Sequence, residues 1–321
     1  MTEKNNTPVD VVIVGGGAAG LNAAQMLGRS RRSVVVVDGG EPRNAPAEGV
    51  HGFLSRDGVS PAELYRIGRE EAAAYGVRII SGQVSGAGGA RGAFSVALED
   101  GSVVRGRRLL IATGLVDELP DIPGLRERWG KDVLHCPYCH GWEVQDQAIG
   151  ILGTGPFAAH QALLFRQWSA NVTLFLNNAM EPTELELHQL AARGITVVHG
   201  PVRALQVDND KLAGVVLSDG SLVPVAAVAA APRFMARAAA FADLGLKAVQ
   251  HPMGMGEYLE TDADGATGVP GVWAAGNVTD LRAQVLSSAA AGAWTGVVIN
   301  ADLMAEELED AVTAYRGSVT A

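Results

Sequence analysis

Two glycine-rich turns, each between a short apolar run and a helical segment, constrain the fold of this chain most strongly. The first turn, Gly15 to Gly20, follows the apolar run Val9–Val14 and precedes Leu21–Arg29, whose apolar residues have helical spacing. A short apolar run that ends in a glycine turn is typical of a buried parallel strand. A second apolar run, Ser33–Val37, ends in the acidic residue Asp38. This order of elements predicts a βαβ unit.

Three spaced glycines in the first turn match the physical needs of a dinucleotide site. Among Gly15, Gly17 and Gly20, one permits the tight turn, one lets the backbone approach a pyrophosphate, and one allows the helix to pack on the strand. The helix N-terminus then offers N–H groups to the phosphates. Asp38 can accept hydrogen bonds from the adenosine ribose. The pattern therefore predicts a bound dinucleotide rather than an empty turn, and it fits FAD and NAD equally.

A second βαβ unit follows later in the chain and makes an internal architectural repeat. It begins with the strand Ala148–Leu152, continues through Gly153-Thr154-Gly155-Pro156-Phe157-Ala158, and reaches a second strand at Val172–Leu176. The first unit has too few strands before residue 120 to complete its sheet. We therefore expect the late strand Val272–Ala275 and the Ala-rich final helix to return to it.

These elements predict an α/β protein with two Rossmann-like dinucleotide-binding domains, the second inserted into the first. The expected boundaries are residues 1–117 and 245–321 for the first domain and residues 118–244 for the inserted domain. The sequence also predicts a helix that begins at Pro61 and a hairpin formed by Phe94–Leu98 and Gly101–Arg105. Leu109–Thr113 is expected to be a separate strand.

Composition restricts the partners of this chain. The formal net charge is -10 and no basic run is interleaved with aromatic residues, so nucleic acid is not an expected partner. The longest apolar run, Leu222–Ala231, contains Pro224 and is too short to span a bilayer. The segment Met1–Asp10 is polar and lacks the apolar core of a secretion signal. We therefore expect a cytoplasmic protein with no membrane partner.

The two cysteines of the chain, Cys136 and Cys139, are three positions apart. Thiols at this spacing fit the first turn of a helix, where Pro137 needs no N–H. Backbone amides and the helix dipole there lower the pKa of a thiol and raise the fraction of reactive thiolate. The segment predicts catalytic thiol–disulfide exchange. The neutral imidazole of His140 is a candidate to exchange a proton with a substrate thiol, and His135 is a second candidate.

Other interpretations of the cysteine pair are a zinc site, a structural disulfide and a glutaredoxin-like domain. A zinc site needs four well-separated ligands, whereas the cysteines and flanking histidines are crowded, so no metal is expected. A structural disulfide is uncommon in an intracellular protein. A glutaredoxin-like domain has no room, because a new βαβ unit follows at once. The remaining histidines, which we interpret as surface or packing residues, are His51, His160, His188, His199 and His251.

Nearly the whole chain resembles the low-molecular-weight thioredoxin reductase family. The resemblance is carried by the first glycine turn, Ala112-Thr113-Gly114, the Cys-x-x-Cys before the second glycine turn, and Gly271-Val272-Trp273-Ala274-Ala275-Gly276-Asn277. It implies FAD in the first site, Cys139 against the isoalloxazine, Cys136 facing the substrate, and a homodimer. It also implies the following FAD-binding residues: Gly15, Gly17, Ala18, Ala19, Gly20, Asp38, Gly39, Arg43, Asn44, Val84, Ala112, Thr113, Gly114, Gly276, Asn277, Gln284 and Val285.

The chain departs from the reductase pattern at three places. Asn277 stands where the family usually has an acidic residue, and His140 stands where reductases carry Asp after the second cysteine. The reductases also carry a His-Arg-Arg stretch that grips the 2′-phosphate of NADPH, whereas this chain has Leu176-Asn177-Asn178. A charge-assisted contact to phosphate contributes about 1.5–3 kcal/mol, so its loss should weaken NADPH binding severely.

The changes at His140 and at Leu176-Asn177-Asn178 resemble one branch of the family, the dithiol oxidases of gliotoxin, holomycin and romidepsin biosynthesis. This resemblance implies that the chain oxidises a small-molecule dithiol, a natural-product precursor, to a disulfide through Cys136 and Cys139. Electrons would then pass through FAD to O2, which becomes H2O2. The alternative enzyme is an NAD(P)H-dependent reductase of a thioredoxin-like protein. The non-enzymatic alternative is a flavin and thiol redox sensor.

Overall fold

The computed structural model describes residues 7–319, so most of the polar segment predicted at the N-terminus, residues 1–6, lies outside the described part. The chain divides into two compact units. Unit 1 contains residues 7–45, 62–116 and 234–319, and unit 2 contains residues 46–61 and 117–233. The fold is therefore discontinuous in sequence, as the two βαβ units predicted.

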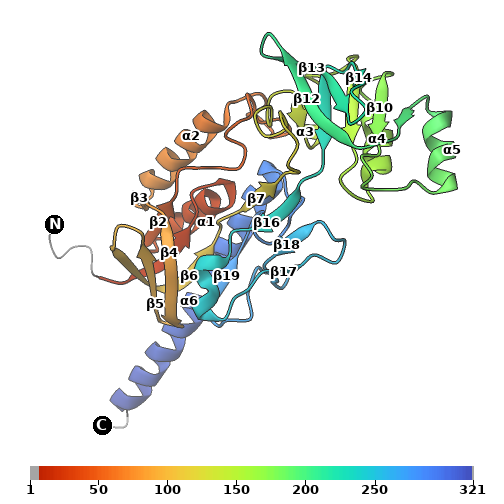
Figure 1. Ribbon diagram of the computed structural model, residues 1–321. Helices are drawn as coiled ribbons and strands as arrows, with labels where there is room; N and C mark the ends of the chain where they lie inside the picture. Colours follow the sequence, from red (N-terminus) through yellow and green to blue (C-terminus); the bar gives the residue numbers. More distant parts are fainter. Residues whose placement is uncertain (1–6, 320–321) are drawn as a thin grey trace. The chain divides into compact units, whose positions relative to one another are not determined.

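Figure 1 labels most of the elements of both units. Unit 1 contains β1 (Val9–Val14), α1 (Ala18–Arg29), β2 (Val34–Asp38), α2 (Pro61–Ala74), β3 (Arg78–Ser81), β4 (Val84–Ala90), β5 (Ala93–Leu98), β6 (Val103–Ile111), η2 (Ala239–Leu244), β17 (Val249–Gln250), β18 (Gly256–Tyr258), β19 (Val272–Ala274) and α6 (Val285–Val319). Unit 2 contains β8 (Val133–Leu134), α3 (Pro137–His140), β9 (Ile149–Leu152), α4 (Ala158–Phe165), β10 (Val172–Phe175), α5 (Glu184–Ala192), β11 (Thr196–Val198), β12 (Val202–Asp208), β13 (Lys211–Leu217), β14 (Leu222–Val223) and β15 (Ala227–Ala230). The unit boundaries fall in β7 (Leu115–Glu118) and near the start of β16 (Arg233–Ala236).

The main sheet of unit 1 has the strand order β3-β2-β1-β6-β5-β4, with β19 also paired to β6. The central strand β1 is buried on both faces from Val11 to Val14, which explains the continuous apolar run there. Val11 and Ile13 pack in the same cluster as residues of α1 and α6, and Val12 and Val14 pack in the cluster on the other face. β19 is parallel to β6, so the predicted return of the late strand to the first sheet is confirmed.

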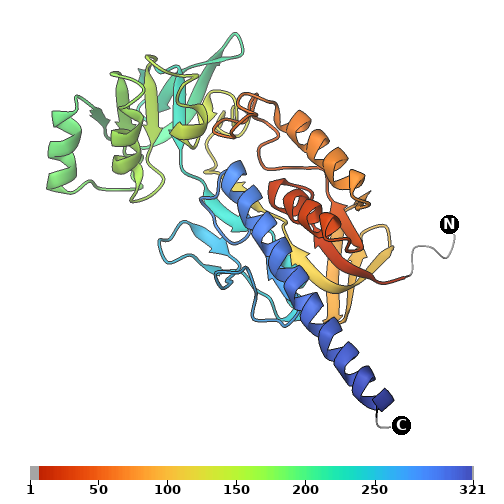
Figure 2. The same ribbon diagram turned by 180° about the vertical axis from the view of Figure 1, so that it is seen from behind.

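The final helix α6 runs alongside α1, as both views show (Figure 2). The two helices approach closely because α6 has glycines where it meets α1. A Cβ on Gly292 would lie 1.9 Å from the carbonyl oxygen of Ala19, and a Cβ on Gly296 would lie 3.0 Å from that of Ala23. The helix that carries the first glycine turn is therefore held in place by a segment more than 250 residues later in the chain.

One strand prediction was wrong. The segments 101–105 and 109–113 were expected to be separate strands, but β6 runs unbroken from 103 to 111. Arg107 and Arg108 lie within the strand; Arg108 is fully buried and donates to Asp302 at 2.5 Å and Glu306 at 2.6 Å, both on α6. Hydrogen bonds from Arg107 and Arg108 lower the pKa of Glu306 to about 2. Arg107 and Arg108 can therefore lie within β6, because α6 supplies carboxylates that pair with them.

Two segments group differently from the domain boundaries that the sequence suggested. Residues 234–244 lie in unit 1, where Phe241 of η2 is fully buried in the same cluster as Phe94. Residues 46–61 lie in unit 2, together with the cysteine segment. Pro46 packs so closely on Gly130 that a Cβ at Gly130 would lie 2.6 Å from it. A piece of the early chain is therefore part of the unit that carries Cys136 and Cys139.

Unit 2 is built on a second Rossmann-like sheet, of order β11-β10-β9-β15-β8, in which every neighbouring pair is parallel. This confirms the second βαβ unit. The antiparallel strands β12, β13 and β14 form a separate small sheet. Within residues 7–319, no helix combines the length and apolar character needed to cross a bilayer.

Candidate functional site

The first glycine turn lies between β1 and α1, and two of its three spaced glycines have little space around them. Gly15 has φ +112°, and a Cβ there would lie 2.2 Å from the carbonyl oxygen of Ala112. A Cβ on Gly20 would lie 1.9 Å from the carbonyl oxygen of Gly15. Gly17 differs, since no heavy atom lies within 4 Å of the position of its Cβ. Gly15 and Gly20 are therefore needed by the protein itself, whereas Gly17 borders open space.

The N-terminus of α1 faces the same turn. Gly17 is the N-cap residue and no side chain caps the helix. The first N–H groups of a helix have no partner within the helix, so those of Ala18 and Ala19 are suited to a phosphate. An uncapped helix start beside an open glycine is the arrangement that a dinucleotide pyrophosphate requires.

Asp38 ends β2 beside this turn. Its carboxylate accepts a hydrogen bond from the backbone of Gly40 at 3.0 Å and lies 3.5 Å from the guanidinium of Arg69. A Cβ on Gly16 would lie 2.4 Å from the carboxylate carbon of Asp38. Gly16 is thus required by the close approach of Asp38, a role that the spaced glycine pattern did not reveal.

The segment Gly271–Asn277 leads into a loop that is closed by Asn277. The Asn277 amide donates to the carbonyls of Asp280 at 3.0 Å and Ala283 at 2.8 Å, and its oxygen faces Arg43 at 3.5 Å. An aspartate could not donate the two bonds to carbonyls. The departure from the acidic residue of the reductases is therefore explained by the folding of the loop that precedes α6.

The other residues predicted to contact FAD also lie in unit 1. The Thr113 hydroxyl donates to the carbonyl of Arg237 at 2.7 Å, and the Asn44 oxygen accepts from the buried hydroxyl of Tyr65 at 3.1 Å. Further members stand at element ends or in turns: Gly39 after β2, Val84 at the start of β4, Ala112 and Gly114 after β6, Gly276 after β19, and Gln284 and Val285 at the start of α6. Their contact with FAD stays a prediction.

Alanine at Gly17 and at Gly20 should separate binding of the cofactor from folding. Gly17→Ala places a methyl group in open space, so we expect an unchanged melting temperature of the apoprotein and an FAD dissociation constant raised about tenfold or more. Gly20→Ala places a methyl group against backbone, so we expect a loss of about 1–3 kcal/mol of stability even without FAD. Thermal unfolding and fluorescence titration with FAD measure both. Equal FAD affinity of wild type and Gly17→Ala would contradict a pyrophosphate at this turn.

The cysteine segment lies in unit 2 between β8 and β9. Cys136 is the N-cap residue of the short helix α3, and its carbonyl accepts from the backbone N–H groups of Cys139 and His140, both at 3.2 Å. Pro137 occupies the first helical position, so the predicted placement at a helix start is confirmed. Both cysteines are half-buried. One helical turn therefore fixes both positions of the predicted redox pair.

His140 is the last residue of α3 and is half-buried. Burial lowers the pKa of this imidazole; the nearby Glu143 carboxylate raises it, and His51 lowers it. The net direction is down, which favours the neutral imidazole at neutral pH. A neutral imidazole one residue from Cys139 can accept the proton of a thiol.

His135 precedes the pair and is anchored rather than exposed. Its Nδ1 lies 3.2 Å from the carbonyl oxygen of Ala230, and its own carbonyl accepts from the amide of Gln161 at 3.0 Å. Since a carbonyl only accepts, Nδ1 carries the hydrogen and Nε2 is left as an acceptor in the neutral ring. His135 thus links the cysteine segment to β15 and α4.

The second glycine turn retains its backbone form. A Cβ on Gly153 would lie 2.6 Å from the carbonyl oxygen of Leu176, and the Cβ position of Gly155 borders open space. After β10, Asn177 and Asn178 both have φ +52°. The Asn177 side chain donates to the Gly153 carbonyl at 3.2 Å and accepts from the Val202 N–H at 2.8 Å. Where the reductases carry arginines for NADPH, this chain therefore has the neutral side chain of Asn177, which is hydrogen-bonded to the backbone of Gly153 and Val202.

Two aromatic rings near the cysteines were not singled out from the sequence. Tyr138 lies between them and is 65% exposed, and Trp142 follows shortly after and is 70% exposed. The Tyr138 ring meets Trp168 edge to face, with centroids 5.7 Å apart. Large exposed rings beside a reactive pair are candidate contacts for an apolar substrate.

His51 was interpreted as structural, but it belongs to the surroundings of His140. Across the described part of the chain, no group of three or more His, Cys, Asp or Glu side chains could hold a metal ion.

Comparisons with known proteins agree with this geometry. The family model for pyridine nucleotide-disulphide oxidoreductases matches residues 9–296. The crystal structure of HlmI is 46% identical, covers 99% of each chain and has a TM-score of 0.91. An oxidoreductase from Agrobacterium tumefaciens is 36% identical over 93% of this chain and 99% of that chain, with a TM-score of 0.87.

Curated relatives include thioredoxin reductase sirT of Leptosphaeria maculans, which is 30% identical over 91% of this chain and 93% of that protein. Thioredoxin reductase tcpT of Claviceps purpurea is 36% identical, but the match spans only 56% of its length. A probable thioredoxin reductase of Arthroderma benhamiae is matched over 37% of its length. The family model and the long matches together decide the family. The chain belongs to the pyridine nucleotide-disulphide oxidoreductases and is an FAD-binding disulfide oxidoreductase with the thioredoxin reductase fold.

Proposed function

We propose that this protein oxidises a small-molecule dithiol to a disulfide through Cys136 and Cys139, with O2 as the final electron acceptor. The observation that carries the proposal is the Asn177 turn after β10, where the side chain bonds to Gly153 and Val202. A turn that carries Asn177 and Asn178 instead of arginines is poorly suited to the 2′-phosphate of NADPH, so electrons enter more readily from a substrate thiol. The similarity to HlmI, a holomycin dithiol oxidase, supports this direction.

The residues of unit 2 divide the reaction into two exchange steps. His140 takes the proton of the first substrate thiol, and the thiolate attacks Cys136 in the Cys136–Cys139 disulfide, releasing Cys139 as thiolate. The second substrate thiol then attacks the substrate sulfur of the mixed disulfide and releases Cys136. The substrate loses two electrons and two protons and leaves as a disulfide. FAD, held by the turn at Gly17 and by Asp38, would supply the acceptor for the two electrons of the reduced pair, with O2 as the final oxidant and H2O2 as its product.

The cofactor and the substrate are expected to contact different parts of the chain. Gly17, the start of α1 and Asp38 form the cradle suited to the FAD pyrophosphate and ribose. Tyr138 and Trp142, both largely exposed, supply apolar surface beside the cysteine pair. A small apolar dithiol would use such rings, since aromatic side chains bury a large area with few rotatable bonds.

Anaerobic stopped-flow mixing tests the direction of electron flow. The holoenzyme is mixed with dithiothreitol, with NADPH and with NADH, and flavin absorbance is followed. We expect bleaching by dithiothreitol and none by NADPH on the same time scale. In air, dithiothreitol oxidation should consume one O2 and release one H2O2 per disulfide formed. Fast bleaching by NADPH without bleaching by dithiothreitol would reject the proposal.

A reductase that uses NADH is the second candidate function. It is favoured by the open space beside Gly155, which still allows a pyrophosphate to approach the second turn. NADH has no 2′-phosphate and so does not need the missing arginines. Bleaching by NADH in the same experiment would identify this function.

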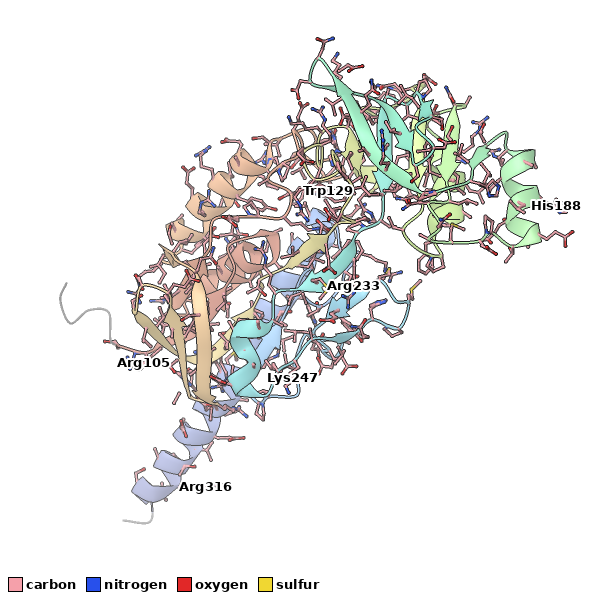
Figure 3. All side chains as sticks on the ribbon, viewed as in Figure 1. Arg105, Trp129, His188, Arg233, Lys247 and Arg316 are labelled. Carbon is pink, nitrogen blue, oxygen red and sulfur yellow. The ribbon has the colours of Figure 1, made fainter. Side chains whose placement is uncertain are left out.

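A second copy of the chain is the partner that suits the last turns of α6. The exposed apolar residues Met304, Leu308, Val312, Tyr315 and Val319 follow one face of the helix, at spacings of three and four residues. The end of α6, where Arg316 is labelled, extends beyond the sheet of unit 1 (Figure 3). A helix face of this kind is stable in water when a matching helix covers it.

Glutamate on this face should weaken the dimer. The double variant Leu308→Glu and Tyr315→Glu is expected to raise the dissociation constant about a hundredfold or more, since burying each side chain contributes about 1.5–3 kcal/mol. Thr313→Glu adds the same charge on another face and is the control. Sedimentation velocity distinguishes the 33.3 kDa monomer from the dimer. A monomeric wild type would contradict the homodimer.

A further inference from the structure

A cluster of titratable side chains lies around the end of α3 in unit 2. The Nε2 of His51 lies 3.3 Å from a carboxylate oxygen of Glu143, and its Nδ1 lies 3.4 Å from one of Asp57. Glu143 is three residues after His140, in the turns that continue from α3. His51 and Asp57 come from the segment 46–61, which belongs to the same unit although it is far away in sequence.

The segment that carries His51 is shaped by its own hydrogen bonds. Val50 pairs with Val59 through a backbone bond of 2.8 Å, and Asp57 accepts from the backbone of Gly52 at 3.0 Å. A Cβ on Gly49 would lie 3.1 Å from the Nε2 of His51, so the imidazole is packed against this turn. The side chain of His51 is 28% exposed. Its position is therefore set by the loop rather than by free rotation in solvent.

Both ring nitrogens of His51 face carboxylates. Nε2 faces Glu143 and Nδ1 faces Asp57. His51 therefore lies beside Glu143, and the two groups shift the pKa of His140 in opposite directions. The charged groups that face His140 are Glu143 from its own segment and His51 from the loop, and Asp57 faces His51.

We propose that His51 is a positioning residue of the dithiol reaction: it compensates the charge of Glu143 so that His140 stays a neutral base. This inference rests on the proposed function, in which His140 takes the proton of a substrate thiol. The contact of His51 with Glu143 at 3.3 Å and the place of Glu143 three residues after His140 carry it. Burial lowers the pKa of His140 most strongly, while Glu143 and His51 act on it in opposite directions.

Removing either His51 or Glu143 should therefore leave the effect of the other on the pKa of His140 unopposed. In His51→Gln the Glu143 carboxylate stabilises the charged form of His140, so the acid limb of the pH profile of kcat/KM moves to higher pH. In Glu143→Gln the limb moves to lower pH, and in the double variant it returns close to the wild-type position. We expect kcat/KM at pH 6 to fall about threefold to tenfold in His51→Gln.

A charge-conserving variant separates electrostatics from packing. His51→Lys keeps a cation near Glu143 and should restore most of the wild-type profile, whereas a merely structural role of the imidazole would not be rescued. His188→Gln removes an exposed histidine of α5 in the same unit and is the matched control (Figure 3). FAD content and melting temperature of each holoprotein show that the fold is intact.

The experiment has two readouts on the FAD-loaded protein. One is kcat/KM against pH with dithiothreitol. The other is an NMR titration of the protein labelled at its 7 histidines, with His140 assigned from its loss in His140→Gln. Opposite shifts of His140 in the two single variants support the inference, even if dithiothreitol is not turned over and the proposed function fails. An unchanged His140 titration in His51→Gln and in Glu143→Gln overturns it, whatever the activity.

Discussion

Replacing Cys136 or Cys139 with serine is expected to abolish dithiol oxidation while FAD remains bound. The two residues occupy the N-cap and first turn of α3, a place where serine is well tolerated, so the backbone should not change. A serine oxygen forms no disulfide and cannot take part in the exchange. We expect kcat with dithiothreitol to fall by about a thousandfold or more in each variant. Oxygen consumption measures turnover, and flavin absorbance after gel filtration measures bound FAD.

Tyr138→Phe is the matched control, because Tyr138 lies between the cysteines and is 65% exposed. It should keep at least about a third of the wild-type kcat, since only an exposed hydroxyl is lost. Anaerobic mixing of either serine variant with dithiothreitol should leave the flavin oxidised. If both variants still bleached at the wild-type rate, the dithiol would reduce FAD directly, and the cysteine pair would lie outside the path of the electrons.

The parts of the fold that could be predicted from the sequence depend on local constraints. β1, the turn after it and β2 were predicted because Gly15 and Gly20 are needed by contacts within a few residues or with a neighbouring strand. The helix start at Cys136 was predicted for the same reason, since the position of Pro137 already indicates a first turn. These segments carry a clear signal in their own residues, although Gly15 also depends on Ala112, which follows the neighbouring strand β6.

The features that were missed depend on residues far away in sequence. Arg108 continues β6 only because α6, almost 200 residues later, supplies Asp302 and Glu306. A pair of arginines within a strand carries no signal of such a partner. In the same way, nothing near His51 indicates that Glu143 will lie 3.3 Å from its ring. The cysteine helix could be predicted, but the charges that face its histidine could not.

The second glycine turn shows that a change of side-chain type is visible in the sequence, whereas the contacts of the new side chain are not. The absence of a cation at Asn177 was visible in the sequence and predicted weak binding of NADPH. That its side chain ties Gly153 to Val202 follows only from the structure, where the residue takes a left-handed backbone conformation. Asparagine tolerates this conformation better than most residues, which gives the substitution a structural role of its own.

Arg108→Ala is expected to cause the largest loss of stability of any single substitution considered. The guanidinium is fully buried and donates to Asp302, to Glu306 and to a backbone carbonyl at 3.1 Å. Its removal takes a fully buried cation away from the two carboxylates, which keep the partly exposed Arg91 and Arg107. Breaking a buried ion pair on one side costs about 3–5 kcal/mol, far more than the loss of an exposed pair. Urea unfolding of the holoprotein, followed by circular dichroism and flavin fluorescence, measures this loss.

Arg91→Ala is the control, because Arg91 contacts the same two acids of α6 but is 45% exposed. Solvent screens its charge, so its removal should cost about 1 kcal/mol or less. The difference between the two arginines therefore measures burial rather than charge, since both variants remove one cation near the same carboxylates. Equal losses in the two variants would mean that α6 is held by the sum of its surface charges. A larger loss in Arg108→Ala would mean that one buried guanidinium fastens α6 to β6. The same contact would then also hold α1, the helix that follows the first glycine turn and packs on α6.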